Sequence, residues 1–352
     1  MLKFLRSFLC SPNTVSPESV ASLSTEPPGE VVAPGVEAFP LESYLSQVEG
    51  LPYLDWQAVT QWLESIETPE VQAKAWADCE IAWLLHLKAV LGESFTLSQQ
   101  GDAVLLSSLE PNIARITLEY MNKTLRRIQR VLDGIAQVPE WGKDILIVFD
   151  NEEMYYQYVS HYYPEGEYAG SSGMHIGQGC GHFVTMKADL SAIEPVIAHE
   201  MTHGCLSHLP IPMWLNEGLA VNTERRVSRV PPLLYTPHEM QQKHLRYWDA
   251  PKIQEFWSGK SFLRTDDGNL LSYDLAQKIV EQFASNWDVF RAFALSANIA
   301  DGGASAAIEQ FNLDLGEVAA VLIGRDPSPD WAPFPSTWSA VSANGGLVET
   351  VS

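Results

Sequence analysis

The stretch AHEMTHGCLSHLPIPMWLNEGLAV, residues 198–221, contains the most informative pattern of the chain. His199 and His203 are four residues apart, and residues at this spacing lie one above the other on one face of an α-helix. Both imidazoles can then bind one metal ion. Glu200 is rotated from His199 by about 100° around the helix axis. Its carboxylate would therefore lie beside the ion without binding it, and H-E-x-x-H predicts a zinc site with an adjacent general base.

A second helix is expected to begin near Pro212, because proline is favoured in the first turn of a helix. Glu217 lies fourteen residues after His203, which is far enough for one helix to end and the next to turn back across it. Gly218 would let another backbone approach closely. The apolar residues expected to pack this helix inward are Trp214, Leu215 and Leu219. A buried carboxylate needs a cation nearby, so we predict that Glu217 is the third ligand.

A different zinc motif, H-E-x-x-H-x-x-G-x-x-H, is excluded. It would require glycine at position 206 and histidine at position 209, and both positions are leucine. Cys205 lies two residues after His203, on roughly the opposite side of the helix, so we interpret it as a packing residue. A carboxylate rather than a third histidine therefore completes the predicted ligand set.

The composition limits the classes of partner. The chain has 352 residues, with 22 Lys and Arg against 44 Asp and Glu, for a net charge of −22. This balance repels phosphate backbones, so nucleic acid is a poor partner. Two groups of basic residues are interpreted as solvated faces; they are Lys123, Arg126, Arg127 and Arg130, and Arg225, Arg226 and Arg229. No apolar run is long enough for a transmembrane helix, and we expect no stable membrane insertion.

The four cysteines are scattered and form no C-x-x-C pair, which is typical of a reducing compartment and predicts a cytoplasmic protein.

The pattern of the chain predicts four regions. Residues 1–40 are rich in Pro, Ser and Glu and predict a disordered leader. Residues 41–93 show helical apolar spacing, beginning with LESYLSQV, and predict a helical N-terminal region. Residues 94–324 would form the main domain, and residues 325–352 an irregular or disordered tail.

Within the main domain the spacing of apolar residues predicts a small sheet with flanking helices. Short strands are expected at 94–99, 103–108 and 144–150, and helices at 110–136 and 152–163. The segment GSSGMHIGQGCGHFVTMKAD has glycines that match neither a phosphate loop nor a dinucleotide fingerprint. It predicts a hairpin, with MHI as one strand and HFVTM as the other.

HEMTH followed by P-x-W-L-N-E-G-L-A resembles the gluzincin zinc metallopeptidases, and most closely their peptidase MA-like domains. The resemblance covers residues 94–324; the two zinc motifs are specific, and the flanks are weak. It implies an α+β, thermolysin-like catalytic domain with a small mixed sheet, an active-site helix and a C-terminal helical subdomain. It also implies that His199, His203 and Glu217 bind Zn²⁺ and that Glu200 is the general base. LLSYDLAQKIVEQF is similar to the family's tyrosine-bearing helix, which makes Tyr273 the candidate oxyanion donor.

The predicted function is therefore a zinc peptidase acting on a peptide or protein substrate, with an endopeptidase favoured because the G-A-M-E-N-type sequence of the aminopeptidase branch is absent. The alternative is a zinc-stabilised scaffold without turnover, although a structural zinc site has no need of Glu200. One imidazole partner is considered from the sequence, namely Glu224, two turns after Glu217. Further residues that could reach the cleft, each also open to a structural role, are His175, His182, Tyr235, His238 and His244.

Overall fold

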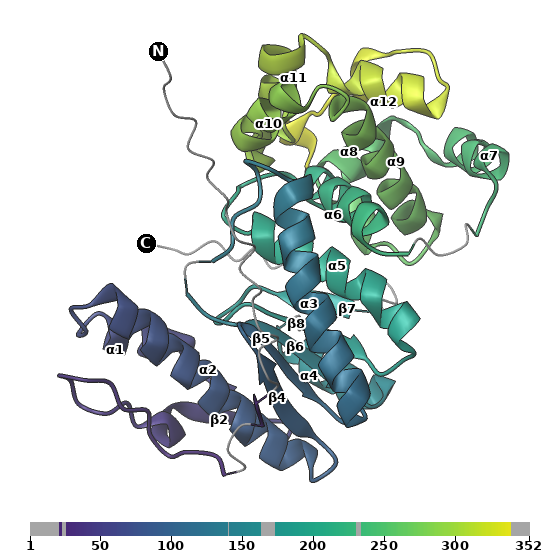
Figure 1. Ribbon diagram of the computed structural model, residues 1–352. Helices are drawn as coiled ribbons and strands as arrows, with labels where there is room; N and C mark the ends of the chain where they lie inside the picture. Colours follow the sequence, from purple (N-terminus) through teal and green to yellow (C-terminus); the bar gives the residue numbers. More distant parts are fainter. Residues whose placement is uncertain (1–20, 23–25, 140, 163–172, 230–233, 339–352) are drawn as a thin grey trace, which may run out of the picture.

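A six-stranded mixed sheet lies at the centre of the computed structural model, which describes residues 21–22, 26–139, 141–162, 173–229 and 234–338 (Figure 1). The strand order is β1-β4-β5-β6-β8-β7. The bounds are β1 Ala21–Ser22, β4 Thr96–Gln100, β5 Ala103–Ser107, β6 Asp144–Phe149, β7 Gly173–Ile176 and β8 His182–Met186. Strands β5, β6 and β8 run parallel, and the remaining neighbours pair antiparallel. The predicted hairpin at the glycine-rich segment is confirmed as β7 and β8.

Both faces of the sheet are buried, because successive residues of a strand point to opposite faces. In β6, Leu146 and Val148 belong to one hydrophobic core, and Ile145 and Ile147 belong to the other. All four side chains are at most 1% exposed. This explains why DILIVF is almost continuously apolar, as expected for a parallel strand covered on both sides.

Different helices cover the two faces. One face packs against α1 Trp56–Leu63, α2 Pro69–Leu91 and α4 Glu152–Tyr162. The other packs against α3 Pro111–Val131 and α5 Leu190–Leu206, and this core continues into the C-terminal helices. Those helices are α6 Met213–Val227, α7 Pro237–Tyr247, α8 Ala250–Trp257, α9 Asp267–Phe283, α10 Trp287–Ser296, α11 Ala304–Phe311 and α12 Leu315–Ile323. They gather at one end of the molecule, where the colours of Figure 1 run from teal through green to yellow. The predicted α+β class is confirmed.

The prediction of a disordered leader is wrong for residues 26–40, and the rest of that prediction lies outside the described residues. Val31 and Phe39 exchange two backbone hydrogen bonds, of 2.8 and 2.9 Å, and both side chains are buried. They join the same core as α2 and one face of the sheet. The few apolar residues of this segment are enough to hold it, because they enter a core that other elements already form.

The prediction of a helix at LESYLSQV is also wrong. Leu41–Tyr44 forms one 3-10 turn, and Leu45–Val48 is strand β2, which pairs antiparallel with β3, Leu51–Leu54. The connection is Glu49-Gly50, and both residues have positive φ, 51° and 83°. Two such residues form the turn whose twist suits a two-residue hairpin. The helical region 41–93 thus contains a hairpin, and it shares its core with the sheet rather than forming one of its own.

After α12 the chain has no long regular element in the described residues up to 338. Two 3-10 turns occur, at Pro329–Trp331 and Pro335–Thr337. Trp331 is 6% exposed and packs into the C-terminal core, and its carbonyl accepts a hydrogen bond from Trp257 Nε1 at 2.8 Å. The predicted irregular tail is therefore irregular but packed over residues 325–338, and its remainder lies outside the described residues.

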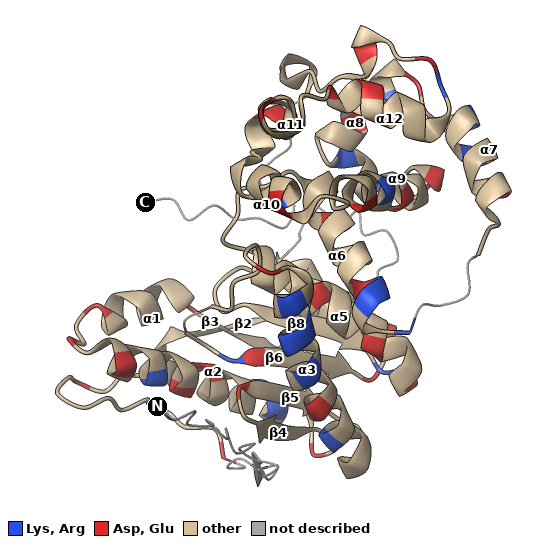
Figure 2. Cartoon of the chain, turned by 45° about the horizontal axis from the view of Figure 1, so that its top comes forward, with Lys and Arg blue, Asp and Glu red and all other residues tan. Residues whose placement is uncertain are grey.

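Asp and Glu are spread over both the sheet region and the C-terminal helices, as Figure 2 shows in red. This distribution fits the net charge of −22. Among the described residues, no helix combines the length and the apolar character needed to cross a membrane.

One carboxylate is buried far from the zinc motif. Glu80 on α2 is 1% exposed, and its oxygens accept hydrogen bonds from Trp76 Nε1 at 2.7 Å and from the Lys143 backbone N–H at 2.9 Å. It thereby ties α2 to the segment that enters β6. Burial raises the pKa of Glu80 to about 8, although the hydrogen bonds from Trp76 and Lys143 act in the opposite direction.

The protein is expected to lose stability as the pH rises from about 4.5 to about 8, partly through Glu80. The folded state holds the Glu80 proton more tightly than the unfolded state does, whose ordinary pKa is 4.5. This contribution is therefore fully present below pH 4.5 and is lost as the pH rises through 8. The upper limit is about 5 kcal/mol, at about 1.4 kcal/mol for each pH unit. Urea unfolding of Glu80→Gln should show a flatter pH profile than the wild type, and parallel profiles would contradict this assignment.

Candidate metal centre

Helix α5 presents His199 and His203 on one face because its opposite face is held in the core. Ile193, Ile197 and Met201 are each 1% exposed and pack towards α3 and the sheet. The side chains of His199 and His203 remain 15% and 13% exposed on the other side. Their rings lie 4.8 Å apart between centroids, as expected for residues four positions apart on a helix. Cys205 is buried in the same core, so its predicted packing role is confirmed.

Helix α6 turns back across α5 and brings Glu217 to the two histidines. Pro212 is its N-cap, and the predicted inward residues Trp214, Leu215 and Leu219 are at most 1% exposed. The indole N–H of Trp214 donates to the carbonyl of Gly302 at 2.9 Å. A Cβ at Gly218 would lie 2.7 Å from the Ala276 carbonyl oxygen of α9. Glycine therefore permits the close approach of α9 immediately beside Glu217, as predicted.

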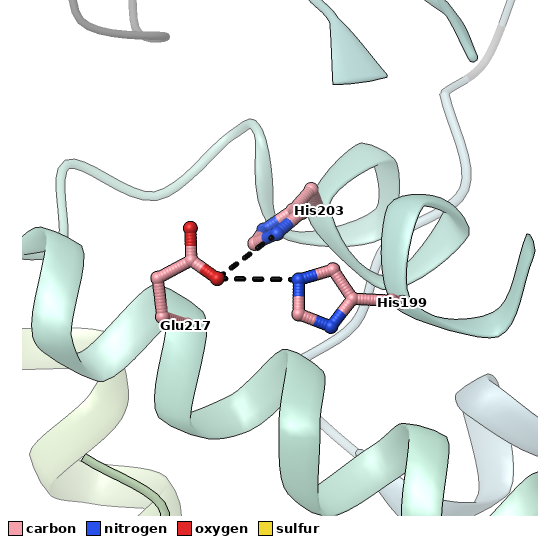
Figure 3. A group of neighbouring side chains, drawn as sticks. All are labelled: His199, His203 and Glu217. Atoms are coloured by element: carbon pink, nitrogen blue, oxygen red, sulfur yellow. Dashed lines mark hydrogen bonds and ion pairs between the residues drawn. The ribbon is translucent and has the colours of Figure 1, made fainter. Parts of the chain in front are cut away.

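The three side chains point towards one another (Figure 3). Oε2 of Glu217 lies 3.2 Å from Nε2 of His199 and 3.5 Å from Nε2 of His203. One donor atom from each residue lies within 4.8 Å of the others. Two atoms bound at zinc distances to a tetrahedral ion are about 3.4 Å apart. The two nitrogen–oxygen separations therefore fit a single zinc ion, and the residues form a possible metal-binding group.

Each imidazole is oriented through its other nitrogen. Nδ1 of His199 lies 3.3 Å from Oε2 of Glu224, and Nδ1 of His203 lies 2.8 Å from Oδ1 of Asn216. With these oxygens accepting, Nδ1 carries the proton and Nε2 is left with its lone pair towards the centre. The sequence suggests Glu224 as a partner of an imidazole nitrogen, but it does not suggest Asn216 for this role. Its position immediately before Glu217 was the only available signal.

The charges of the group are mutually dependent. Burial disfavours a charged imidazole, but hydrogen bonds to Glu217 and Glu224 outweigh it and hold the pKa of His199 well above its ordinary value. The charge of Glu217 likewise overcomes burial and raises the pKa of His203. Burial alone would raise the pKa of Glu217, yet the two histidines hold it far below its ordinary value. Protons thus supply the positive charge that this cluster requires, and a dication could take their place.

Zinc binding near neutral pH is therefore expected to release about one or two protons for each ion, because the imidazoles must be neutral to act as ligands. Isothermal titration calorimetry in two buffers with different ionisation enthalpies measures this number directly. The release should decline at higher pH, where the metal-free histidines have already lost their protons. Identical binding enthalpies in both buffers at pH 7 would contradict the expectation.

Glu200 and Tyr273 lie beside the three donors. Glu200 is 8% exposed, and its carboxylate accepts a hydrogen bond from the backbone N–H of His175 on β7. Burial raises the pKa of Glu200, and the neighbouring histidine charges only partly offset this. The Tyr273 side chain on α9 lies beside Glu217, and burial together with the charges of Glu217 and Glu200 raises the pKa of Tyr273 well above its ordinary value. The structure therefore brings together all five residues selected from the sequence.

Two of the other histidines have structural surroundings instead. His182 is 1% exposed, with Nε2 2.7 Å from the Tyr158 hydroxyl and Nδ1 2.9 Å from the Cys180 carbonyl oxygen. His244 is also 1% exposed, and its Nε2 lies 2.7 Å from Asp274 Oδ2. Trp248 donates its indole N–H to His244 Nδ1 at 2.8 Å. Both side chains are therefore fixed within the core rather than directed to the metal group.

Replacing Glu224 with Gln should weaken zinc binding by about tenfold. Loss of a residue that hydrogen-bonds to a metal ligand typically weakens metal binding by about 10- to 100-fold. An amide oxygen can still accept from Nδ1 of His199, but the negative charge that strengthens this contact is lost. Competition with a chromogenic zinc chelator would measure the change. Glu194→Gln, on α5 and outside the donor group, is the matched control. Equal affinities for the two variants would remove Glu224 from the site.

No protein-family model matches the chain, and no curated protein matches it either. The chain is therefore described by its own geometry, as an α+β protein with a possible metal-binding group formed by His199, His203 and Glu217.

Proposed function

We propose that this protein is a zinc-dependent peptidase, and that an endopeptidase is the form its motifs favour. The observation that carries the proposal is the buried carboxylate of Glu200 beside a group that, among the described residues, has three donors. A structural zinc ion is normally enclosed by four protein ligands, whereas a catalytic one has three and leaves a position for water. A scaffold would gain nothing from a carboxylate held next to that position.

The arrangement of elements supports a gluzincin-like domain. Strand β7 is last in the strand order and packs beside α5, and α6 supplies the carboxylate donor. Helix α9 packs closely on α6 and brings Tyr273 to the same point. Two histidines from one helix, a glutamate from the next and a tyrosine from a later one match the set that the sequence resemblance implies. We therefore extend the proposal to a thermolysin-like catalytic fold.

The proposed reaction assigns a separate task to each residue. His199, His203 and Glu217 would hold zinc, which when bound lowers the pKa of water and polarises a carbonyl group. Glu200 takes a proton from the attacking water and delivers it to the leaving amine. Burial raises the pKa of Glu200, which makes it a stronger proton acceptor than an exposed carboxylate. Tyr273 retains its proton and can donate a hydrogen bond to the developing oxyanion.

The substrate class is a peptide or protein, and the remaining assignments follow from composition. Cys79, Cys180 and Cys205 are buried free thiols, which is compatible with a reducing compartment, and we infer a cytoplasmic location. The net charge of −22 disfavours nucleic acid as a partner.

The test is cleavage of a proteome-derived peptide library by protein loaded with one zinc ion per chain. New peptide termini should appear, disappear after chelation and return when zinc is added back. Mass spectrometry of the termini would also define the residues on each side of the cut. Full zinc occupancy without any cleavage across the library would favour the alternative, a zinc-stabilised scaffold.

A further inference from the structure

Six exposed arginines form a positive surface that the metal site does not use. They are Arg126, Arg127 and Arg130 on α3, and Arg225, Arg226 and Arg229 at and just beyond the end of α6. We call them the arginine surface. They account for six of the 22 Lys and Arg residues in a chain whose net charge is −22.

Tertiary packing joins the two groups of arginines, which are about a hundred positions apart in the sequence. Nη1 of Arg127 donates a hydrogen bond to the Val227 carbonyl oxygen at 2.9 Å. The Arg127 guanidinium on α3 therefore contacts Val227, the last residue of α6. In the sequence Val227 lies between Arg226 and Arg229. Figure 2 shows the blue segments of α3 and of the end of α6 on the same side of the molecule.

Acidic residues in the described parts of the chain do not neutralise these arginine side chains. Within the described residues, none of the six takes part in an ion pair, although 44 Asp and Glu residues are available in the sequence. Two basic residues earlier on α3 behave differently, because Arg115 and Lys123 lie 2.6 and 3.8 Å from the carboxylate of Glu119. Glu224, the nearest acid on α6, is directed to His199 instead.

The chemistry of the surface indicates the ligand. A guanidinium binds a carboxylate or phosphate through two parallel N–H donors, and all six residues are arginine rather than lysine. A long polyanion would also experience the repulsion of the strongly acidic remainder of the molecule. A short acidic segment would not, since exposed charges are screened beyond about 8 Å at physiological salt. We propose that the arginine surface is a docking site for an acidic segment of a polypeptide.

This proposal does not depend on zinc or on peptide cleavage. The arginines lie on the exposed side of α3 and at and just beyond the end of α6, whereas the three donors lie between α5 and α6. Binding to the arginine surface should therefore persist after chelation, and in a variant that cannot cleave peptides. A finding that the protein does not cleave peptides would therefore leave the docking site untouched. A finding that the arginine surface binds no acidic peptide would likewise leave the proposed peptidase activity untouched.

The experiment is fluorescence anisotropy with a fluorescein-labelled peptide of ten glutamates and the full-length protein. The double variant Arg126→Glu/Arg226→Glu should bind at least about tenfold more weakly than the wild type, since two attractive contacts become repulsive. Wild-type binding should also weaken by about tenfold between 50 and 300 mM salt. Neither side chain makes a hydrogen bond or ion pair in the described structure, and thermal melting would verify that the variant is folded.

The matched control is Arg246→Glu/Lys260→Glu, which changes the net charge equally at exposed positions outside the arginine surface. It should retain near-wild-type affinity. Equal losses in both double variants would show that only the overall charge matters and would overturn the docking site. The absence of peptide binding, or tighter binding of a ten-nucleotide single-stranded DNA than of the glutamate peptide, would also overturn it.

Discussion

Glu200→Gln is expected to abolish peptide cleavage while zinc remains bound at one ion per chain. Loss of a positioned general base reduces turnover by about 10²–10⁴-fold. The amide is nearly isosteric, so the backbone N–H of His175 retains an acceptor at this position. Glu200 is not among the three converging donors, and its removal should leave metal affinity close to that of the wild type.

Zinc content by atomic emission and cleavage rates on one identified peptide would test this pair of expectations. Glu194→Gln provides a matched control, since it removes one carboxylate from the same helix and should retain activity. Two results would contradict the assignment. Unchanged cleavage would show that Glu200 is not the base, and loss of zinc along with activity would show that it acts as a ligand.

Glu217→Gln should weaken zinc binding more than about 100-fold. This loss exceeds the effect of replacing a residue that only hydrogen-bonds to a metal ligand. Glu217 is the only anionic donor of the group, and its oxygen lies 3.2 and 3.5 Å from the two histidine nitrogens. A neutral amide oxygen would neither balance the dication nor hold the imidazoles as firmly. Turnover should be lost at limiting zinc concentrations.

Thermal denaturation gives a second measurement of this loss, because a ligand that binds only the folded state stabilises it. At zinc concentrations about 1,000 times the dissociation constant, the wild type should gain about 4 kcal/mol. For a chain of 352 residues this corresponds to a rise in Tm of roughly 5 °C. A 100-fold weaker variant would gain only about 1.4 kcal/mol under the same conditions. Glu281→Gln, at an exposed position on α9, is the control, and an equal zinc-induced shift in Glu217→Gln would exclude Glu217 as a ligand.

The N-terminal region shows where local patterns were insufficient. The apolar spacing of LESYLSQV is compatible with one face of a helix, but Glu49 and Gly50 adopt positive φ and reverse the chain into a hairpin. Residues 26–40 have the composition of a disordered segment. Their order depends on Val31 and Phe39 entering a core built by α2 and the sheet, which no local property of the segment reveals.

The outer partners of the site show the same limit. Asn216 enters the sequence analysis only as one letter of P-x-W-L-N-E-G-L-A, yet its side-chain oxygen lies 2.8 Å from Nδ1 of His203. Glu224 is considered from its place two turns after Glu217, but only the crossing of α6 over α5 brings it to His199. Which polar side chain meets which imidazole depends on the crossing of two helices, and that crossing is set by the cores on their other faces.

The sequence by itself determined the parts of this protein that short-range geometry controls. A four-residue spacing on one helix fixes His199 and His203 on a common face, and the adjacent position brings Glu200 beside them. The tertiary structure decided what lies opposite them: Glu217 from α6, Tyr273 from α9, and the meeting of two arginine groups across α3 and α6. The physical reason is that helix periodicity is a property of a few neighbouring residues, whereas contacts between helices follow from burying all their apolar faces together.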